Sequence, residues 1–527
     1  MLRAVLTLAI VWLCWWGSAR ADAPPALEFV VKSFQVEGTN PLSEAASVAA
    51  LAPFLGLHTG IDRLLAATDA LNVALRDGGF SFYRATLPPQ ALDRGTVTLK
   101  IVAFGLHSVS VRGQQHFSEA SIERSLPALV AGAAPNTRAI ARDLAVANEH
   151  PSKTLKVNFR ESEELPDMLD AVVNVSDERP WNLFAGVNDI GTAETGRSRV
   201  SVGGQYTDLT GHDDILSGSF TTSFENFNDV RQYAGFYQLP LYGIGSWLNA
   251  FYVHSDVAVG NVQNVFDVSG AGEFVGLSLR HPLLALGRYH HAVSAGLQDR
   301  LFDTAVSLAA NGQTNLANST KARSRPLSLR YDGGYNWRTT SLDFYLDFNQ
   351  NLSFGGHNHD LDYEHARHGA NASWKALRFG ALVTQRLPYD FSGVARMTGQ
   401  YANEPLLPGE ELGFGGAKTV RGFAERVVAG DKGLILNFEL WSPPITRLLD
   451  VRLLGFVDIG HKVLEQHDPR SRQRPNDTLS SVGVGARWQW HKQLTLAVDY
   501  GLPLAHASGE TADRGTSKWH LDLQYRY

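Results

Sequence analysis

Apolar and polar residues alternate along most of the chain from about residue 180 to its end. The last nine residues show this without a break. Polar residues alternate there with five apolar or aromatic ones: Trp519, Leu521, Leu523, Tyr525 and Tyr527. A period of two with one apolar and one polar face is typical of strands in a transmembrane barrel. About sixteen such strands fit, at ~10 residues each plus turns. The pattern therefore predicts an antiparallel transmembrane β-barrel over residues 179–527. Any one of these strands, taken alone, also fits a soluble β-sandwich or propeller.

Residues 22–178 show a different pattern, in which short strands enclose helical segments. A strand at 29–36 is followed by a short helix that begins near Ser43 and by a second helix. The second helix carries an apolar stripe: Ile61, Leu64, Leu65, Thr68, Leu71 and Leu75. Two more strands complete a β-α-α-β-β order, and the same order recurs further on. We therefore predict an internal repeat, with a first repeat unit at 22–103 and a second repeat unit at 104–178.

The first 21 residues predict a secretory signal peptide. An early arginine precedes an apolar run from Ala4 to Trp16, and Ala19-Arg20-Ala21 has the form of a cleavage site. The run is short for a membrane helix, which needs ~20 residues. Cys14, the one cysteine of the chain, lies within this segment, so we expect no disulfide in the mature protein. Removing the leader leaves 45 of the 47 Lys and Arg residues against 53 Asp and Glu, a charge that gives no reason to bind nucleic acid.

One stretch interrupts the strands of the barrel, at Gly413 to Glu425 within a long loop at 402–431. It is too rich in glycine for a strand and too apolar for a solvated turn. We predict that this loop folds back into the lumen, where Arg421 is a fixed positive charge among the glycines. The strand at 451–460 turns Asp458 toward the lumen by its alternation, so Asp458 is an available partner for Arg421. The predicted loop motif comprises Gly415, Gly416, Val420, Arg421, Gly422 and Phe423.

The motif GGAKTVRGFAE and the strand GFVDIG resemble the signature loop and partner strand of TpsB transporters, the ShlB/FhaC/HecB group of haemolysin secretion/activation proteins. LPPQALDRGTVTLKIV, in the first repeat unit, looks like the first POTRA domain of these proteins, and QYANEPLLPGEE looks like the lead-in to their loop. The resemblance implies two periplasmic POTRA domains followed by a barrel in the bacterial outer membrane. It also implies that the arginine and the aspartate meet inside the barrel.

The function implied by this resemblance is two-partner secretion. The partner would be one large TpsA-type exoprotein, a haemolysin or an adhesin, bound in unfolded form by the POTRA sheet edges. Other expected partners are outer-membrane lipids and the machinery that inserts barrels. We expect no enzyme activity, catalytic residue, cofactor or metal. Many family members begin with a plug helix, and the short segment after Ala21 predicts that this chain has none.

Two other functions remain open at this point. An assembly factor of the same superfamily would insert many barrels, although such factors usually have more than two POTRA domains. A simple porin would need no POTRA domain. The histidines His357, His359, His365 and His368 could in principle bind a metal, but their spacing fixes no tetrahedral set, and an exposed loop is the favoured interpretation.

Overall fold

The structure is a computed structural model, and it describes residues 28–527 except 93, 193–194, 258, 263–265, 270, 305–306, 311–312, 317–319, 447–449, 467–473, 492 and 506–516. The predicted signal peptide lies outside the described residues. The chain forms two compact units. The first contains the residues up to Val109 together with 128–140 and 159–171, and the second contains 110–127, 141–158 and 172–527.

The first repeat unit has the predicted order of elements with two additions. Its elements are β1 (Glu28–Val31), β2 (Ser33–Gly38), α2 (Glu44–Leu51), β3 (Gly56–Thr59), α3 (Asp62–Asp77), β4 (Tyr83–Thr86) and β5 (Thr96–Ala103). The predicted strand at 29–36 divides at Lys32, because the amides of Lys32 and Ser33 both donate to the carbonyl of Gly95. β1 then pairs with β3, a strand that the sequence did not predict, while β2, β5 and β4 form a separate sheet.

The helices of this unit follow the sequence closely. Ser43 caps α2, since its hydroxyl accepts from the amide of Ala46. Of the predicted stripe on α3, four residues are buried, but Ile61 and Leu65 are 54% and 46% exposed. Leu65 lies away from the face that packs on the sheet, and Ile61 lies just before the helix, so this part of the prediction was wrong.

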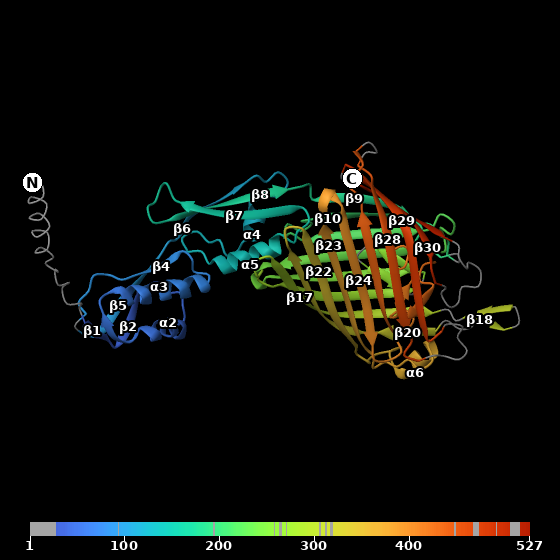
Figure 1. The fold of residues 1–527 in the computed structure, drawn as a ribbon, viewed down its shortest axis with the longest axis horizontal. Helices are drawn as coiled ribbons and strands as arrows, with labels where there is room; N and C mark the ends of the chain where they lie inside the picture. The colour runs from blue at the N-terminus through green and yellow to red at the C-terminus, as the bar shows by residue number, and fades with distance from the viewer. Residues whose placement is uncertain are drawn as a thin grey trace, which may run out of the picture. The chain divides into compact units, whose positions relative to one another are not determined.

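The second repeat unit contains β6 (Leu106–Arg112), α4 (Glu119–Arg124), α5 (Thr137–Ala147), β7 (Lys153–Glu161) and β8 (Leu169–Asp177). Its sheet has the order β6-β8-β7, so β8 lies between the other two strands. The hydroxyl of Ser118 caps α4, as the sequence predicts. The repeat of a helix pair against a three-stranded sheet is therefore present in both units (Figure 1).

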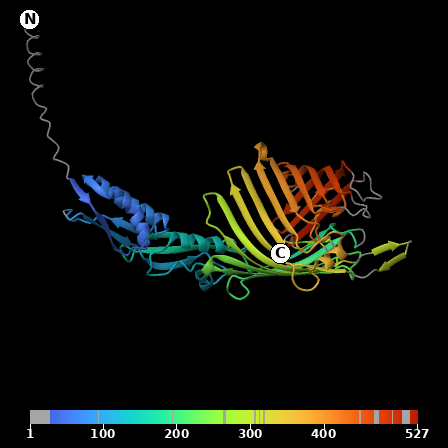
Figure 2. The ribbon, with the colours of Figure 1, turned by 90° about the horizontal axis from the view of Figure 1, so that it is seen from below.

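The rest of the chain forms a closed antiparallel barrel of sixteen strands, which confirms the predicted fold class. Figures 1 and 2 show these strands lying side by side around the barrel. β20 and β21 are two parts of one wall strand, since both pair with β17. The wall strands are β9 (Trp181–Asn188), β10 (Arg199–Thr207), β11 (Ile215–Thr222), β12 (Gln232–Leu241), β13 (Ser246–Ser255), β16 (Gly272–Pro282), β17 (Tyr289–Thr304), β20 (Thr320–Ser324), β21 (Pro326–Asn336), β22 (Thr340–Asn351), β23 (Lys375–Arg386), β24 (Ser392–Ala402), β27 (Lys432–Trp441), β28 (Arg452–Val463), β29 (Asn476–Trp490), β30 (Leu494–Pro503) and β31 (Lys518–Arg526).

The alternation in the sequence sets which side chains face outward. On β31, Trp519, Leu521 and Tyr525 are exposed on the outer wall, while His520 is buried on the other face. On β28, Leu453 and Val457 face outward, and Leu454, Phe456 and Asp458, which alternate with them, are buried on the lumen side. Apolar residues outside and polar residues inside are the arrangement that a barrel surrounded by lipid needs.

One element of the barrel half differs from the prediction. The histidine-rich segment contains a short helix, α6 (Asp360–Ala366), where an exposed loop was expected and where no helix was predicted at all. Asp362 accepts from the amide of His359 and caps the helix, and Tyr363 is fully buried beneath it. The segment is therefore partly helical and packs on the barrel through Tyr363, while the four histidines are exposed, as predicted. Among the described residues, no group of His, Cys, Asp and Glu is arranged to hold a metal.

The structure also contains smaller hairpins, β14–β15 (Val259–Val262 and Phe266–Ser269), β18–β19 (Ser307–Ala310 and Gln313–Leu316) and β25–β26 (Leu412–Phe414 and Val428–Gly430). Within the described part of the chain, the helices are all too short or too polar to cross a membrane.

Candidate functional site

The loop between β24 and β27 forms a small hairpin of its own. β25 and β26 pair from Leu412–Gly430 to Phe414–Val428, and the tip between them carries the predicted motif. Gly415, Gly416 and Gly422 have φ values of 97°, 109° and 89°, a backbone conformation that favours glycine. A side chain at Gly416 would also collide with the carboxylate of Glu425. The glycines of the motif are therefore needed to form the turn at its tip.

The structure brings Arg421, at the tip of this hairpin, against Asp458 on β28. Nε and Nη2 of Arg421 donate to the two carboxylate oxygens of Asp458 at 2.8 Å each, and the Arg421 amide donates to the same carboxylate at 3.1 Å. Asn437 donates a further hydrogen bond to Asp458 at 2.8 Å. Both charged side chains are nearly inaccessible, at 4% and 0% exposed. Removing Arg421 would leave the buried charge of Asp458 without its cationic partner, at a cost of roughly 3–5 kcal/mol.

Other groups of the wall complete this site, which we call the Arg421 anchor. Glu439 lies 2.7 Å from Nη1 of Arg421, and Asp499 lies at 3.6 Å. Asp499 also receives two hydrogen bonds from Arg487, at 2.7 and 2.8 Å. The guanidinium of Arg421 stacks 3.5 Å above the ring centre of Phe456, where a cation–π contact strengthens as water is excluded. The wall thus meets one loop cation with several acidic groups and an aromatic face.

The apolar residues of the motif pack in the same place. Val420 and Phe423 are 0% and 1% exposed, and they belong to a cluster with Phe414, Val428, Ile435 and Leu479. Gly422 lies directly against Gly501 on β30: a Cβ atom at Gly501 would come within 2.6 Å of the Gly422 amide nitrogen. Glycine on both sides therefore lets the loop backbone touch the wall.

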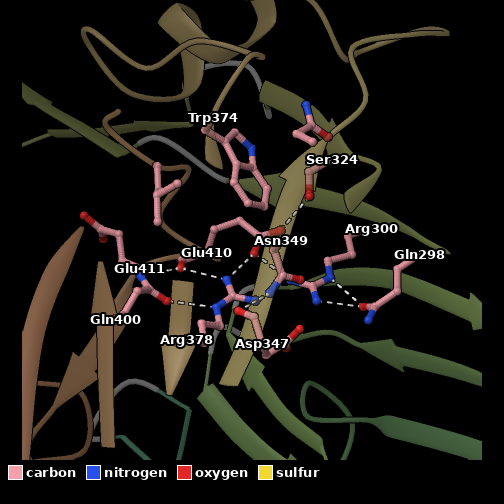
Figure 3. Close-up of polar contacts among 12 residues, drawn as sticks. Gln298, Arg300, Ser324, Asp347, Asn349, Trp374, Arg378, Gln400, Glu410 and Glu411 are labelled. Carbon is pink, nitrogen blue, oxygen red and sulfur yellow. Dashed lines mark hydrogen bonds and ion pairs between the residues drawn. The ribbon is translucent and has the colours of Figure 1, made fainter. Parts of the chain in front are cut away.

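A second group of polar contacts holds the loop near the end of β24, and we call it the Glu410 anchor (Figure 3). The carboxylate of Glu410 accepts from Arg300 on β17 at 2.5 Å and from Arg378 on β23 at 2.8 Å. Its other oxygen accepts from the hydroxyl of Ser324 at 2.6 Å. The Glu410 side chain is completely buried. Here the loop supplies the negative charge and the wall supplies the positive ones.

Beside this anchor, at one end of the barrel, the start of the loop packs against α6. Leu406 and Leu407 pack with Tyr363 and Trp374 in an apolar cluster that also includes side chains of the wall: Ala234, Val253, Phe274, Phe302, Ala322, Ala376 and Ala402. Arg367 links the two segments, since it donates to Asp431 at 2.6 and 2.8 Å and to the carbonyl of Leu406 at 2.6 Å. We call this cluster, with Arg367 and Asp431, the cover.

At the opposite end of the barrel, the turn between β10 and β11 contacts α4 and β7 of the second repeat unit. These segments and the barrel belong to the same compact unit. Nζ of Lys153 on β7 lies 2.5 Å from the carboxylate of Asp213, and both side chains are buried. Ser121, Ser125 and Tyr242 also donate to Asp213. Burial would raise the pKa of Asp213, but the charge of Lys153 and these hydrogen bonds lower it overall. This residue therefore stays ionised in mildly acidic water.

The predicted site residues come together in space. Val420, Arg421, Gly422 and Phe423 contact the wall, Asp458 binds Arg421, and Gly415 and Gly416 form the turn. Sequence reasoning missed Glu410, Glu439, Phe456 and Gly501. Glu439 and Phe456 share the lumen-facing alternation of their strands, which could have indicated them. Glu410 carried no local signal, because its partners lie 110 and 32 residues away along the chain.

Comparison with known proteins identifies the class to which these features belong. The family model for the haemolysin secretion/activation protein ShlB/FhaC/HecB matches residues 169–488, and a ShlB-type POTRA domain model matches residues 29–103. The outer membrane transporter CdiB of Dickeya dadantii is 23% identical over 85% of this chain and 78% of its own length. The heme/hemopexin transporter protein HuxB of Haemophilus influenzae is 20% identical over 86% of this chain and 79% of its own length. The solved structure of CdiB from Escherichia coli has a TM-score of 0.71 at 18% identity, over 97% of this chain and 92% of that one.

The fold and the lumen site thus define an outer-membrane transporter with POTRA domains at its N-terminus. The chain belongs to the ShlB/FhaC/HecB family. This family is a class of transporters rather than of enzymes. POTRA domains are periplasmic in this family, so the end of the barrel at the Asp213 turn faces the periplasm and the cover faces the exterior. The predicted localisation in the outer membrane is confirmed.

Proposed function

We propose that this transporter exports one large exoprotein through its barrel in an unfolded form. The observation that carries this proposal is the loop, which is bound to the barrel wall through two buried charged anchors. A barrel of this size leaves an aqueous lumen unless something fills it. A loop held in this way narrows the lumen at rest and leaves room for an extended polypeptide on its other side.

The POTRA domains supply the entrance. Each has a small sheet whose outer strands have only one paired edge, β2 and β4 in the first and β6 and β7 in the second. An unpaired strand edge can bind an extended polypeptide through backbone hydrogen bonds. The exoprotein would bind there in the periplasm before it enters the barrel. No cofactor is needed, because folding outside the cell would supply the direction of transport.

We assign different roles to the two anchors. The Arg421 anchor stays closed during export, because moving Arg421 away would leave Asp458 buried without its partner at roughly 3–5 kcal/mol. The cover lies across the exit, so it must open for the exoprotein to leave. The Glu410 anchor lies beside the cover, and its release would let the start of the loop and α6 move apart.

A comparison of the secreted, surface and outer-membrane proteomes with and without this gene in its own host tests the proposal. Loss of one large exoprotein, with its fragments in the periplasm, is the expected result. A broad fall in many barrel proteins would instead identify an assembly factor. An unchanged proteome with altered small-solute permeability would identify a porin.

A further inference from the structure

The lumen wall is divided into a charged part and an uncharged part. Five consecutive strands, β9 to β13, place only uncharged residues in the lumen on the periplasmic side of Arg199. Arg199 itself lies at the exterior end of β10. The residues there are mostly amides, hydroxyls and small side chains, as on β11 with Ser217, Ser219 and Thr221, and aromatic rings lie among them at Phe184, Phe236 and Phe251. We call this surface the neutral wall. Adjacent amides on it bond to each other, since Asn182 donates to Gln205 and Gln238 donates to Asn249.

The remaining strands carry the lumen charges. Arg330 and Asp332 lie on β21, Asp347 on β22 and Arg378 on β23, and further charges follow on β27 to β31. The anchors described above bind the loop to this part of the wall: Arg421 to β27, β28 and β30, and Glu410 to β17, β20 and β23. The anchors therefore fix the loop on the charged side of the lumen.

A cavity of about 480 Å³ lies between three strands of the neutral wall, β9, β10 and β11, and the neighbouring strands β29 to β31. Its lining runs along β11 from Ser217, near the periplasmic end, to Thr221, near the exterior end. Along β9 it runs from Asn182 to Asn188. Among the described residues that line it, the charged side chain is that of Arg526, close to the periplasmic end of β31. A second cavity of about 1280 Å³, around Trp441 and Arg487, shares Gln489, Thr495 and Gln524 with the first.

We propose that the neutral wall is the track along which the exoprotein passes, and that it fits extended segments rich in Ser, Thr, Asn, Gln and Gly. This inference rests on the proposed function. Hydroxyl and amide groups both donate and accept, so they can exchange hydrogen bonds with a polypeptide backbone in any register. They hold no fixed charge that would trap an oppositely charged residue or repel a like one. A charged residue of the exoprotein would instead lose hydration beside a wall that offers it no counter-ion.

Charge placed on the track tests this inference. Ser219 on β11 and Ser328 on β21 are both half-buried serines that face the lumen, but only Ser219 lies on the neutral wall. We expect Ser219→Lys and Ser219→Asp each to slow export about tenfold, which corresponds to about 1.4 kcal/mol. Ser219→Asn should export at the normal rate, and so should Ser328→Lys and Ser328→Asp. The probe is the exoprotein that disappears from the cell surface when the gene is deleted, and heat-modifiable migration checks that each variant barrel folds.

Three results would overturn the inference. The first is normal export by both charged Ser219 variants. The second is an equal loss in the Ser328 series, which would show that any charge narrows the lumen. The third is slower export by only one of the two charged Ser219 variants, which would indicate that this wall selects the exported chain by the sign of its charge. If no exoprotein is lost on gene deletion, the proposed function itself fails, so the two failures are distinguishable.

The chemistry of the exported segment can be varied in the same assay. A short insert of Ser, Asn and Gly in the exoprotein should pass at the normal rate. Inserts of equal length rich in Lys or in Glu should both slow export through the wild-type barrel. Equal export of all three inserts would contradict the assignment of an uncharged partner.

Discussion

The two anchors of the loop are both buried, yet they have opposite polarity. At the Arg421 anchor the loop brings the cation and the wall brings Asp458, Glu439 and Asp499. At the Glu410 anchor the loop brings the anion and the wall brings Arg300 and Arg378. A loop placed in the reverse direction would set like charges against each other in a region with little water to screen them. The difference in charge therefore fixes the direction of the loop as well as its position.

The anchors also differ in their surroundings. The Arg421 anchor includes backbone hydrogen bonds, the contact of Gly422 with Gly501, and the cluster around Phe423. The Glu410 anchor adjoins the cover, which includes α6, a separate segment of the chain. One anchor is thus packed into the wall, and the other lies beside a contact between two separate segments of the chain, the start of the loop and α6.

Breaking the Arg421 anchor should have the largest effect on export. We expect Arg421→Ala to reduce secretion by about tenfold or more, because the stranded charge of Asp458 costs roughly 3–5 kcal/mol and drives the loop off the wall. Asp458→Ala should also reduce secretion, but by less, because Glu439 still pairs with Arg421. The amount of folded barrel in the outer membrane should stay constant, as measured by heat-modifiable migration. Full secretion by both variants would remove this anchor from the mechanism.

Breaking the Glu410 anchor should have a smaller and different effect. Glu410→Gln keeps the shape of the side chain but leaves Arg300 and Arg378 without their counter-ion, so the cover should open more often. We expect the open fraction of the pore to rise about tenfold in planar-bilayer recordings, equivalent to about 1.4 kcal/mol, while secretion continues. A matched control is Glu404→Gln on the same loop, whose carboxylate accepts a hydrogen bond from the neutral side chain of Asn371. Equal conductance in wild type and Glu410→Gln would show that Glu410 does not contribute to closing the pore.

A third buried charged cluster, at the Asp213 turn, provides a comparison outside the lumen. Burial, and then the charge of Lys153, lowers the pKa of the neighbouring His150 to about 4. The unfolded histidine binds a proton near pH 6.5 and the folded one only near pH 4. Acidification through this window therefore favours the unfolded form, by up to roughly 3 kcal/mol. Asp213, with its lowered pKa, stays ionised throughout.

We therefore expect hydrogen exchange in α5 and β7, relative to the intrinsic exchange rate of each amide at that pH, to become faster between pH 6.5 and 4.5, while exchange in the loop changes little on the same scale. The effect should be absent in His150→Asn, whose side-chain oxygen can still accept from the Ser152 amide, as Nδ1 of His150 does. Equal acceleration in the variant would assign the change to other groups.

Much of this architecture could be predicted from the sequence, because the alternation of apolar and polar residues along each strand indicates which side chains face lipid. The same alternation placed Asp458 in the lumen and indicated a partner for Arg421. The short helix α6 could not be predicted in this way, because seven residues are too few to show a helical period and its stability comes from the burial of Tyr363. Glu410 and Gly501 escaped prediction because their roles depend on contacts with distant strands. The role that we assign to each residue in export is a prediction.

The most direct test of the account is a disulfide between the loop and the wall. A Cβ atom at Gly460 would lie 2.9 Å from Cγ2 of Val420, so the two Cβ atoms are at most roughly 4.4 Å apart, within reach of a disulfide. The variant Val420→Cys/Gly460→Cys can be compared with each single cysteine and with its own reduced form. We predict that the oxidised variant secretes its exoprotein as fast as the reduced one, because the Arg421 anchor stays closed. Export by the reduced form but not by the oxidised form would contradict the account.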